Sequence, residues 1–395
     1  MIGFDEAVEL VRSAARPVGT ETVAIAEAAG RVLAEPVIAR IDSPRSDVSA
    51  MDGYALRDAD LETLPASLEL AGESFAGAAW DGSVEPGTCA RIFTGAPVPA
   101  GADRVVIQEN VRREGRRAIV DEPQGAARHM RRRASDFAAG DELLAAGRLL
   151  DPRAIVASAA ADLADVEVCR RPRVEILSTG DELAEPGTAN GRADAIPESV
   201  SFGVAALAGQ WGAECIGRTR LRDDVAAMRL AAAAAVSRVD LVVVTGGASV
   251  GEKDFAKSMF EPLGLELVFS KVSIKPGKPV WLGRTCGKLV MGLPGNPTSA
   301  LVTARLLLAP LLAGLAGRPV AQALAWRTLA LAAPLPACGA RETFHRARST
   351  DGAAEILSFQ DSSAQKALAE ADLLVRQRAN GPALEPGEAA EVLDF

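Results

Sequence analysis

The strongest constraint on the fold is an alternation of short β-branched runs with longer alanine- and leucine-rich helical windows between residues 171 and 318. This alternation is typical of a parallel sheet that is covered by helices. We expect strands at Val174–Leu177, Leu241–Val244 and Leu289–Met291, and a turn containing glycine follows each of them. Ligands of open α/β sheets bind beyond the carboxyl ends of the strands, so the pattern indicates where a site would lie.

The regions on either side of this α/β domain have different patterns. Residues 1–170 contain two helical windows, at about 4–16 and 151–163, around a Gly/Pro-rich and strand-like stretch from about 45 to 147. We interpret this region as a helical linker with a β-rich insertion. Residues 319–395 contain short strand-like pieces broken by proline and glycine, which predicts a small β-barrel or β-sandwich. The expected class is multidomain, α/β plus β-rich.

Composition predicts a soluble cytoplasmic protein. The net charge of −9 disfavours general nucleic-acid binding, which needs a broad basic field. The five cysteines are scattered without a CxxC pair, which indicates a reducing compartment and neither a disulfide framework nor a structural zinc site. The N-terminus lacks the pattern of a signal peptide. The longest apolar stretch, Ala300 to Leu315, contains Arg305 and Pro310, so we expect a buried helix and no membrane span.

Two of the glycine turns have the composition of an anion site. Asn296 and Pro297 suit the N-cap and the first position of a helix over about 297–314, whose free N–H groups would face the strand ends. A plain capped helix would explain this turn equally well on its own. However, Gly246 and Gly247 follow the neighbouring predicted strand and allow close backbone approach to a ligand. Two such turns at adjacent strand ends favour a bound anion.

Carboxylates follow a third strand end. Asp181 and Glu182 come directly after the first predicted strand, and we expect Asp223, Asp224 and Asp254 to converge on the same edge. Oxygen ligands without a nearby histidine or cysteine pair suit Mg²⁺ better than zinc. The alternative for Asp181, Asp223 and Asp224 is that each aspartate merely caps a helix.

Three lysines form a cationic segment that Pro276 and Gly277 bend. Lys271, Lys275 and Lys278 would project from this segment into a cleft, where point charges suit phosphate or molybdate. Lysines on an exposed edge strand are also a common protection against aggregation, so this second explanation remains open for each of them.

The turn after the second predicted strand also matches G-x-S-x-G, the nucleophile motif of α/β-hydrolases. Ser249 would be the nucleophile. That chemistry needs a histidine base after the serine, whereas His129 precedes it and His345 lies in the β-rich tail. No P-loop and no G-x-G-x-x-G motif occurs at a strand–helix junction, which argues against a standard nucleoside triphosphatase or dinucleotide enzyme.

Six motifs in this order resemble the molybdopterin molybdotransferase family, which includes bacterial MoeA proteins and the E domain of gephyrin. They are SAMDGYA at 49–55, TGAPVPAGAD at 94–103, STGDEL at 178–183, TGGASVGEKD at 245–254, IKPGKP at 274–279 and GLPGNP at 292–297. The resemblance implies a three-layer α/β/α molybdopterin-binding domain and a C-terminal β-barrel. It also implies that adenylated molybdopterin and molybdate are converted, with Mg²⁺, to molybdenum cofactor and AMP.

The resemblance further implies an elongated homodimer with a cleft shared between subunits, in which the Asp52 and Thr94 loops face the partner's pterin-binding domain. Asp52, Glu182 and Asp254 would be the functional carboxylates, with the last two on the metal. The molybdopterin adenylyltransferase would be a candidate partner. The implied substrate-binding residues, besides the three lysines, are Thr94, Arg131, Asp136, Thr179, Gly180, Asp223, Gly246, Gly247, Ser249, Pro294, Gly295, Asn296 and Pro297.

Several positions depart from the family pattern, among them Ala134 and Ser135 after the arginine run, and Lys366 in the tail. Val48 and Val200 stand where members commonly have asparagine, and Glu198 stands where they have aspartate. A valine side chain cannot form the hydrogen bonds of an asparagine. These departures motivate a second hypothesis, a non-catalytic paralogue or scaffold that binds molybdopterin.

Overall fold

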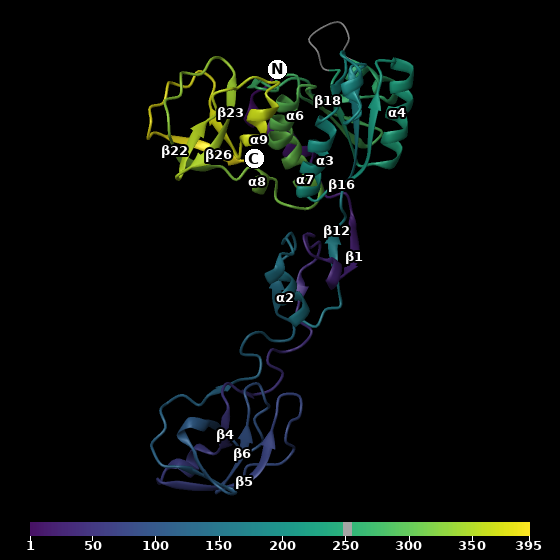
Figure 1. Ribbon diagram of the computed structural model, residues 1–395. Helices are drawn as coiled ribbons and strands as arrows, with labels where there is room; N and C mark the ends of the chain where they lie inside the picture. The colour runs from purple at the N-terminus through teal and green to yellow at the C-terminus, as the bar shows by residue number, and fades with distance from the viewer. Residues whose placement is uncertain (248–254) are drawn as a thin grey trace.

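The computed structural model describes residues 1–247 and 255–395, which form an elongated molecule with three tiers (Figure 1). The first tier contains the α/β domain with the C-terminal β domain beside it. The second is a linker that contains β1 (Thr20–Ala24), β12 (Asp165–Cys169) and α2 (Pro152–Ala160). The third, at the far end of the molecule, is a β-rich lobe. The predicted multidomain class is confirmed.

The α/β domain is built on a six-stranded sheet with the order β16-β13-β17-β21-β20-β18. The first four strands are parallel, β20 is antiparallel to β21, and β18 is antiparallel to β20. The three strands expected from the sequence are the neighbours β13, β17 and β21. Their central member, Leu-Val-Val-Val-Thr, is buried at every position, as expected for a strand that helices cover on both faces. The strands are β13 (Arg173–Thr179), β16 (Glu214–Leu221), β17 (Leu241–Thr245), β18 (Glu266–Phe269), β20 (Trp281–Thr285) and β21 (Lys288–Leu293).

Helices cover both faces of this sheet and make the three layers. α4 (Val225–Arg238) and α5 (Phe255–Ser258) pack on one face. α3 (Val200–Gln210) packs on the other face with α6 (Pro297–Thr303) and α7 (Ala309–Leu315), which a π-helical turn joins into one helix. This joined helix is long and apolar enough to cross a membrane, but 94% of its apolar window is buried in the protein. It is the buried helix expected from the sequence.

The N-terminal helix α1 (Phe4–Ala14) lies in the first tier, which differs from the expectation that groups it with the linker. Its apolar residues Phe4, Ala7 and Val11 recur every three or four positions and are buried in the core that also contains α7 and the C-terminal domain. The ring of Phe4 contacts that of Phe344 at a centroid distance of 4.9 Å. This apolar face is buried only where the two domains meet, so the helix lies there.

The linker is held by two antiparallel strand pairs because the chain passes through it twice. β1 pairs with β12, and β2 (Val37–Ile38) pairs with β11 (Glu142–Leu144). Phe137, which the sequence interpretation placed in the lobe, packs in the linker core. The β-rich insertion is therefore shorter at its C-terminal end than expected.

The lobe contains a six-stranded sheet with the order β7-β4-β6-β5-β9-β8 and a separate pair formed by β3 and β10. Two small apolar clusters fill its interior. The strands are β3 (Val48–Ser49), β4 (Gly53–Leu56), β5 (Ala66–Ser74), β6 (Thr88–Ile92), β7 (Arg104–Ile107), β8 (Arg112–Glu114), β9 (Arg117–Val120) and β10 (Met130–Arg131).

The C-terminal domain is the predicted β-barrel. Five strands follow the order β23-β24-β22-β26-β25, and pairing between β23 and β25 closes the ring. β19 (Ile274–Lys275), which belongs to the lysine segment, joins β23 in parallel and so connects the α/β domain to the barrel. The barrel strands are β22 (Arg327–Leu331), β23 (Glu342–Thr350), β24 (Ala353–Ile356), β25 (Leu373–Gln377) and β26 (Ala389–Asp394).

Gly292 provides a test of the packing in the α/β sheet. It pairs with Trp281 on β20, and a Cβ at Gly292 would lie 1.9 Å from the indole Nε1 of this fully buried tryptophan. We expect Gly292→Ala to lower the free energy of unfolding by about 1–3 kcal/mol, because a rigid ring must move in a packed core. Urea unfolding followed by tryptophan fluorescence measures this change.

Gly209→Ala is the matched control, since Gly209 is exposed on α3 and has open space around its Cα. Gly209→Ala should leave the free energy of unfolding unchanged or raise it by up to about 1 kcal/mol, because alanine has a higher helix propensity than glycine. Equal unfolding midpoints for wild type and Gly292→Ala would contradict the packing described here.

Candidate active site

The order of the strands creates a crevice at the carboxyl edge of the α/β sheet. After β13 the chain crosses the face covered by α3 to reach β16, and it then returns over the opposite face through α4 to reach β17. The next helix after β17 is α5, which packs on the face covered by α4, so the elements that follow β13 and β17 lie on opposite faces. Such a switch point is where open α/β sheets bind ligands. Thr179 and Gly180 lie at one side of it, and Gly246 and Gly247 lie at the other.

The glycine turns at this edge are in backbone contact. A Cβ at Gly246, whose φ is +87°, would lie 2.5 Å from the carbonyl oxygen of Thr179, so the position requires glycine. A Cβ at Gly295 would lie 3.2 Å from the Cα of Gly246. Thr245 donates a hydrogen bond from Oγ1 to Ser178 Oγ at 3.0 Å, which joins the ends of β17 and β13. The structure thus brings together the three turns predicted from the sequence.

The start of α6 lies at the third of these turns. Asn296 occupies the N-cap position, as expected, but its side chain does not cap the helix. Its amide nitrogen instead donates to Ser362 Oγ of the barrel at 3.0 Å, and Thr298 Oγ1 donates to the carbonyl of Ala364 at 3.2 Å. A barrel segment therefore lies against the helix start. Sequence reasoning missed Ser362, because no local pattern links it to a turn 66 residues earlier.

The lysine segment reaches the same edge. β20 runs antiparallel to β21, so its amino end, which follows Lys278, lies beside the carboxyl end of β21. Lys278 is half-buried, whereas Lys275 is exposed and pairs with Thr343 of the barrel. The carbonyl of Lys271 accepts a hydrogen bond from the N–H of Ile2, and the N–H of the next residue, Val272, donates to the carbonyl of Lys278 at 3.1 Å. The pairing of β20 with β21 therefore places Lys278 beside the third glycine turn, and Lys271 and Lys275 belong to the same segment.

The predicted carboxylates near the first turn have different partners. The carboxylate of Glu182 lies over Gly180, because a Cβ at that glycine would meet its Oε2 at 2.6 Å. Asp181 accepts a hydrogen bond from the N–H of Asp223 at 3.4 Å. Asp224 accepts hydrogen bonds from Ala226 and Ala227 and caps α4, which confirms the helix-cap alternative for this residue.

Some predicted site residues lie outside the part of the chain that the structure describes. Ser249 and Asp254 are among them, so the hydrolase nucleophile and one of the two predicted metal ligands have no position here. Within residues 1–247 and 255–395, no group of three His, Cys, Asp or Glu side chains is arranged to hold a metal ion. Glu182 is the predicted metal ligand that the structure describes.

A hollow of about 460 Å³ beside Gly180 contains arginines that sequence reasoning missed. Arg220 and Arg222 come from the end of the edge strand β16 and the residue after it, and Arg192 comes from the loop before α3. Arg220 donates to the carbonyl of Leu183 at 2.7 Å and so bends over the turn. The alternation of arginines at 218, 220 and 222 was the available sequence signal.

The departures from the family pattern have structural roles in this chain. The Glu198 carboxylate accepts hydrogen bonds from the N–H and the hydroxyl of Ser201 at 2.8 and 2.5 Å, and thereby caps the first turn of α3. Val200 is buried in the core on that face of the sheet. Val48 lies on β3, where it pairs with Arg131.

The lobe carries a second cluster of predicted residues. Asp52 accepts hydrogen bonds from the N–H and from the hydroxyl of Thr94, both at 2.8 Å. These bonds to the charged form, the backbone one first, lower the pKa of Asp52 below its ordinary value, and the positive charge of Arg91 adds to the effect. The N–H of Gly95 donates to the carbonyl of Ser49 at 2.8 Å, so the two motif loops are joined.

Arg131 lies beside these loops and Asp136 lies further away. Arg131 is on β10, next to Val48 of β3, and its side chain is exposed. The neighbouring Arg132 and Arg133 form ion pairs with Asp47 and Asp42. Among the described residues Arg131 has no ion pair, so within this run its guanidinium is the one available to an anion. Asp136 donates its N–H to the carbonyl of Ser43, at the junction of lobe and linker.

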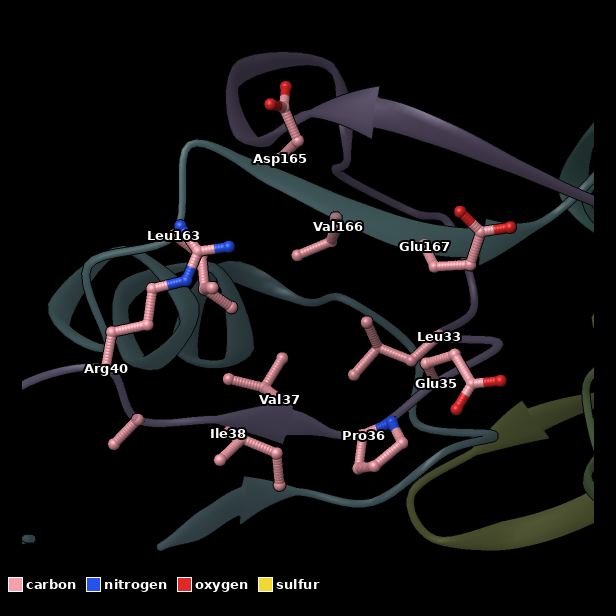
Figure 2. A pocket seen from close by; sticks show the side chains of 11 residues that line it. Leu33, Glu35, Pro36, Val37, Ile38, Arg40, Leu163, Asp165, Val166 and Glu167 are labelled. Carbon is pink, nitrogen blue, oxygen red and sulfur yellow. The ribbon is translucent and has the colours of Figure 1, made fainter. Parts of the chain in front are cut away.

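The two clusters lie at opposite ends of the molecule. Asp52 precedes β4, Thr94 follows β6 and Arg131 is on β10, so all three belong to the lobe. The glycine turns belong to the α/β domain, and the linker lies between these two parts of the molecule (Figure 1). One copy of the chain therefore does not bring Asp52 to Gly246. The linker has a hollow of its own, of about 290 Å³, with an apolar floor at Leu33, Val37 and Val166 (Figure 2). Charged side chains surround it, and none of the predicted site residues lines it.

Comparison with known proteins agrees with this arrangement. Residues 2–161 match the family described as "MoeA N-terminal region (domain I and II)", and residues 175–314 match the "Probable molybdopterin binding domain". The α/β domain is thus similar to domains of the molybdopterin-binding type.

Relatives that span most of the chain identify the family. The molybdopterin molybdenumtransferase of Haemophilus influenzae is 40% identical over 76% of this chain and 74% of its own length. Molybdopterin molybdenumtransferase 2 of Mycobacterium tuberculosis is 34% identical over 89% of this chain and 87% of its own. The molybdopterin biosynthesis MoeA protein from Pyrococcus horikosii superposes with a TM-score of 0.85 at 29% identity, covering 100% of this chain and 99% of that one. The chain belongs to the molybdopterin molybdenumtransferase family, which confirms the resemblance seen in the six motifs.

Thr94→Val tests the electrostatics of the lobe cluster. The substitution removes the hydroxyl that donates to Asp52 and keeps the backbone N–H, so the pKa of Asp52 should rise toward its ordinary value. A carbon-detected NMR titration of the aspartate carboxyls, with Asp52 assigned through Asp52→Asn, measures this pKa.

The effect on stability has a defined sign. The folded-state pKa of Asp52 is depressed, so its ionised form contributes stability above the unfolded pKa and loses it as the pH falls through the folded pKa. The stability difference between wild type and Thr94→Val should therefore shrink on acidification. Thr88→Val is the control, because Thr88 donates to a backbone carbonyl. An unchanged Asp52 pKa in Thr94→Val would contradict the arrangement.

Proposed function

We propose that this chain inserts molybdate into adenylated molybdopterin with release of AMP, a step of molybdenum cofactor biosynthesis. The observation that carries the proposal is the contact of three glycine turns at the switch point of a domain similar to molybdopterin-binding domains. Backbone N–H groups at such turns and at the start of a helix bind phosphate groups. The names of the relatives supply the reaction class, and none of those reported above is a hydrolase.

The charges at the crevice suit two anionic substrates. Lys275 and Lys278 approach it from the barrel side, and Arg220 and Arg222 from the edge strand β16. Arginine presents a planar fork of donors that matches phosphate oxygens, whereas lysine acts as a mobile point charge. We assign the lysines to molybdate or phosphate, and the glycine turns to the phosphates of the pterin substrate.

A magnesium ion fits the donors at this edge. Glu182 offers carboxylate oxygens over the Gly180 turn. Mg²⁺ commonly binds through one or two carboxylates plus the phosphates of the substrate, so a cage of three carboxylates is not required. When bound, the ion would offset the charge that develops on the phosphate as AMP leaves. Glu182 would hold it, with Asp254 as the second expected ligand.

We further propose that the site is completed in a homodimer in the cytoplasm. The lobe that carries Asp52, Thr94 and Arg131 lies at the opposite end of the molecule from the glycine turns, so a second copy has to supply one of the two clusters. A homodimer with two-fold symmetry forms two such shared sites. All five cysteines are free, which suits a reducing compartment.

Release of AMP tests the activity. Purified protein with adenylated molybdopterin, Mg²⁺ and molybdate should release AMP at an enzymic rate, and EDTA should stop the release until Mg²⁺ is restored. Asp52→Asn and Glu182→Gln should each slow it by more than about tenfold, because each removes a charge that acts at the reacting phosphates. Chromatographic quantification of AMP measures the rate.

Asp81→Asn in the lobe and Glu266→Gln on β18 are matched controls, since both residues are exposed and lie outside the predicted site. They should keep the wild-type rate. Undiminished turnover in both Asp52→Asn and Glu182→Gln would refute the roles proposed for these carboxylates.

Mixing the two slow variants tests the shared site. A heterodimer of Asp52→Asn and Glu182→Gln subunits has one intact site, formed by the unchanged lobe of one copy and the unchanged α/β domain of the other. After unfolding and refolding together, random pairing should restore about a quarter of the wild-type rate. If the site lay within one subunit, the mixture would be no faster than its components.

A further inference from the structure

The lobe contains a guanidinium held in a stack of aromatic rings. Arg91 lies on β6 opposite Tyr54 of β4, and its guanidinium carbon is 5.0 Å from the centroid of the Tyr54 ring and 4.7 Å from that of Phe93. Phe93 in turn stacks on Phe75 at a centroid distance of 4.8 Å and an interplanar angle of 14°. Cation–π contacts with two rings restrict both the position and the orientation of this side chain.

From this position Arg91 fixes the backbone around Asp52. Its Nη1 donates to the carbonyl oxygen of Gly53, the residue after Asp52, at 2.9 Å. Its Nη2 donates to the side-chain oxygen of Gln108 at 2.6 Å, and the backbone N–H of Gln108 donates to the carbonyl of Asp52 at 3.0 Å. Arg91 therefore contacts the carbonyl of the residue after Asp52 directly and is linked to the carbonyl of Asp52 through Gln108.

The same residue also contacts the segment that carries Thr94. Arg91 precedes Thr94 by three positions, and the intervening Phe93 packs on the guanidinium. Thr94 supplies both hydrogen bonds that orient the carboxylate of Asp52. One side chain thus connects the strand that carries the carboxylate with the strand end that orients it.

We infer that Arg91 is a positioning residue that holds Asp52 and Thr94 in the geometry required when the lobe meets the substrate. This inference rests on the proposed function, in which Asp52 acts at the site. A displacement of about 1 Å in a reacting group can cost about a hundredfold in rate, so a residue that fixes such a group affects turnover without touching the substrate.

Turnover of Arg91 variants tests the inference. Arg91→Met keeps an apolar stem between the rings and removes the charge and both hydrogen bonds. It should lower kcat for AMP release about 10- to 100-fold, with KM changed less than about threefold. Arg91→Lys keeps the charge without the planar fork and should recover part of this loss. Arg113→Met, an exposed arginine of the same lobe, should keep the wild-type kcat.

A double variant distinguishes an effect of Arg91 on turnover that acts through Asp52 from an effect that is independent of Asp52. If Arg91 acts through Asp52, Arg91→Met combined with Asp52→Asn should be no slower than Asp52→Asn alone. Multiplication of the two single effects would overturn the inference. A fall in the thermal midpoint of Arg91→Met with an unchanged kcat per folded enzyme would show a purely structural role and would overturn it as well.

A measurement without turnover distinguishes failure of this inference from failure of the proposed function. The carboxyl pKa of Asp52, followed by NMR, should rise in Arg91→Met and stay unchanged in Arg113→Met, because only Arg91 adds its charge and its bonds near this carboxylate. Wild-type protein that releases no AMP would refute the proposed function. The pKa of Asp52 in the Arg91→Met variant would still test the positioning role of Arg91. An Asp52 pKa that does not respond to Arg91→Met would overturn the inference even in an active enzyme.

Discussion

Backbone contact between glycine turns sets the geometry of the crevice in the α/β domain. At Gly246 and Gly295 there is no room for a side chain, since a Cβ would lie 2.5 Å from Thr179 and 3.2 Å from the Cα of Gly246. The ends of β13, β17 and β21 therefore approach one another with main-chain atoms, and N–H groups are the donors available at their centre. The cationic side chains come from the surrounding segments, so positive charge lies at the rim of the crevice.

The buried helix that follows the third turn connects this crevice to the barrel. Arg305, in its π-helical turn, donates to the carbonyls of Asp394 at 2.8 Å and Ala323 at 2.6 Å, and burial lowers the pKa of its guanidinium to about 10. At the start of the same helix Asn296 donates to Ser362. A movement of the barrel segment around Ser362 would therefore move the start of this helix.

The lobe holds an ordered carboxylate far from its own α/β domain. Asp52 receives two hydrogen bonds from Thr94, and Arg91 holds the neighbouring backbone from within an aromatic stack. The two clusters are thus prepared separately, each by local contacts. In the proposed homodimer, their assembly depends on how two copies of the chain meet.

The sequence alone determined the features that depend on local patterns. The strands β13, β17 and β21 came from apolar runs that end in glycine turns, and the family came from six short motifs in order. Only the tertiary structure decided which partners the side chains of those motifs meet. Asn296 bonds Ser362 instead of capping its helix, α1 joins the first tier, and Arg91 serves Asp52 from another strand. Each of these contacts joins residues distant in the chain, and no local period or spacing records which distant segments the core brings together.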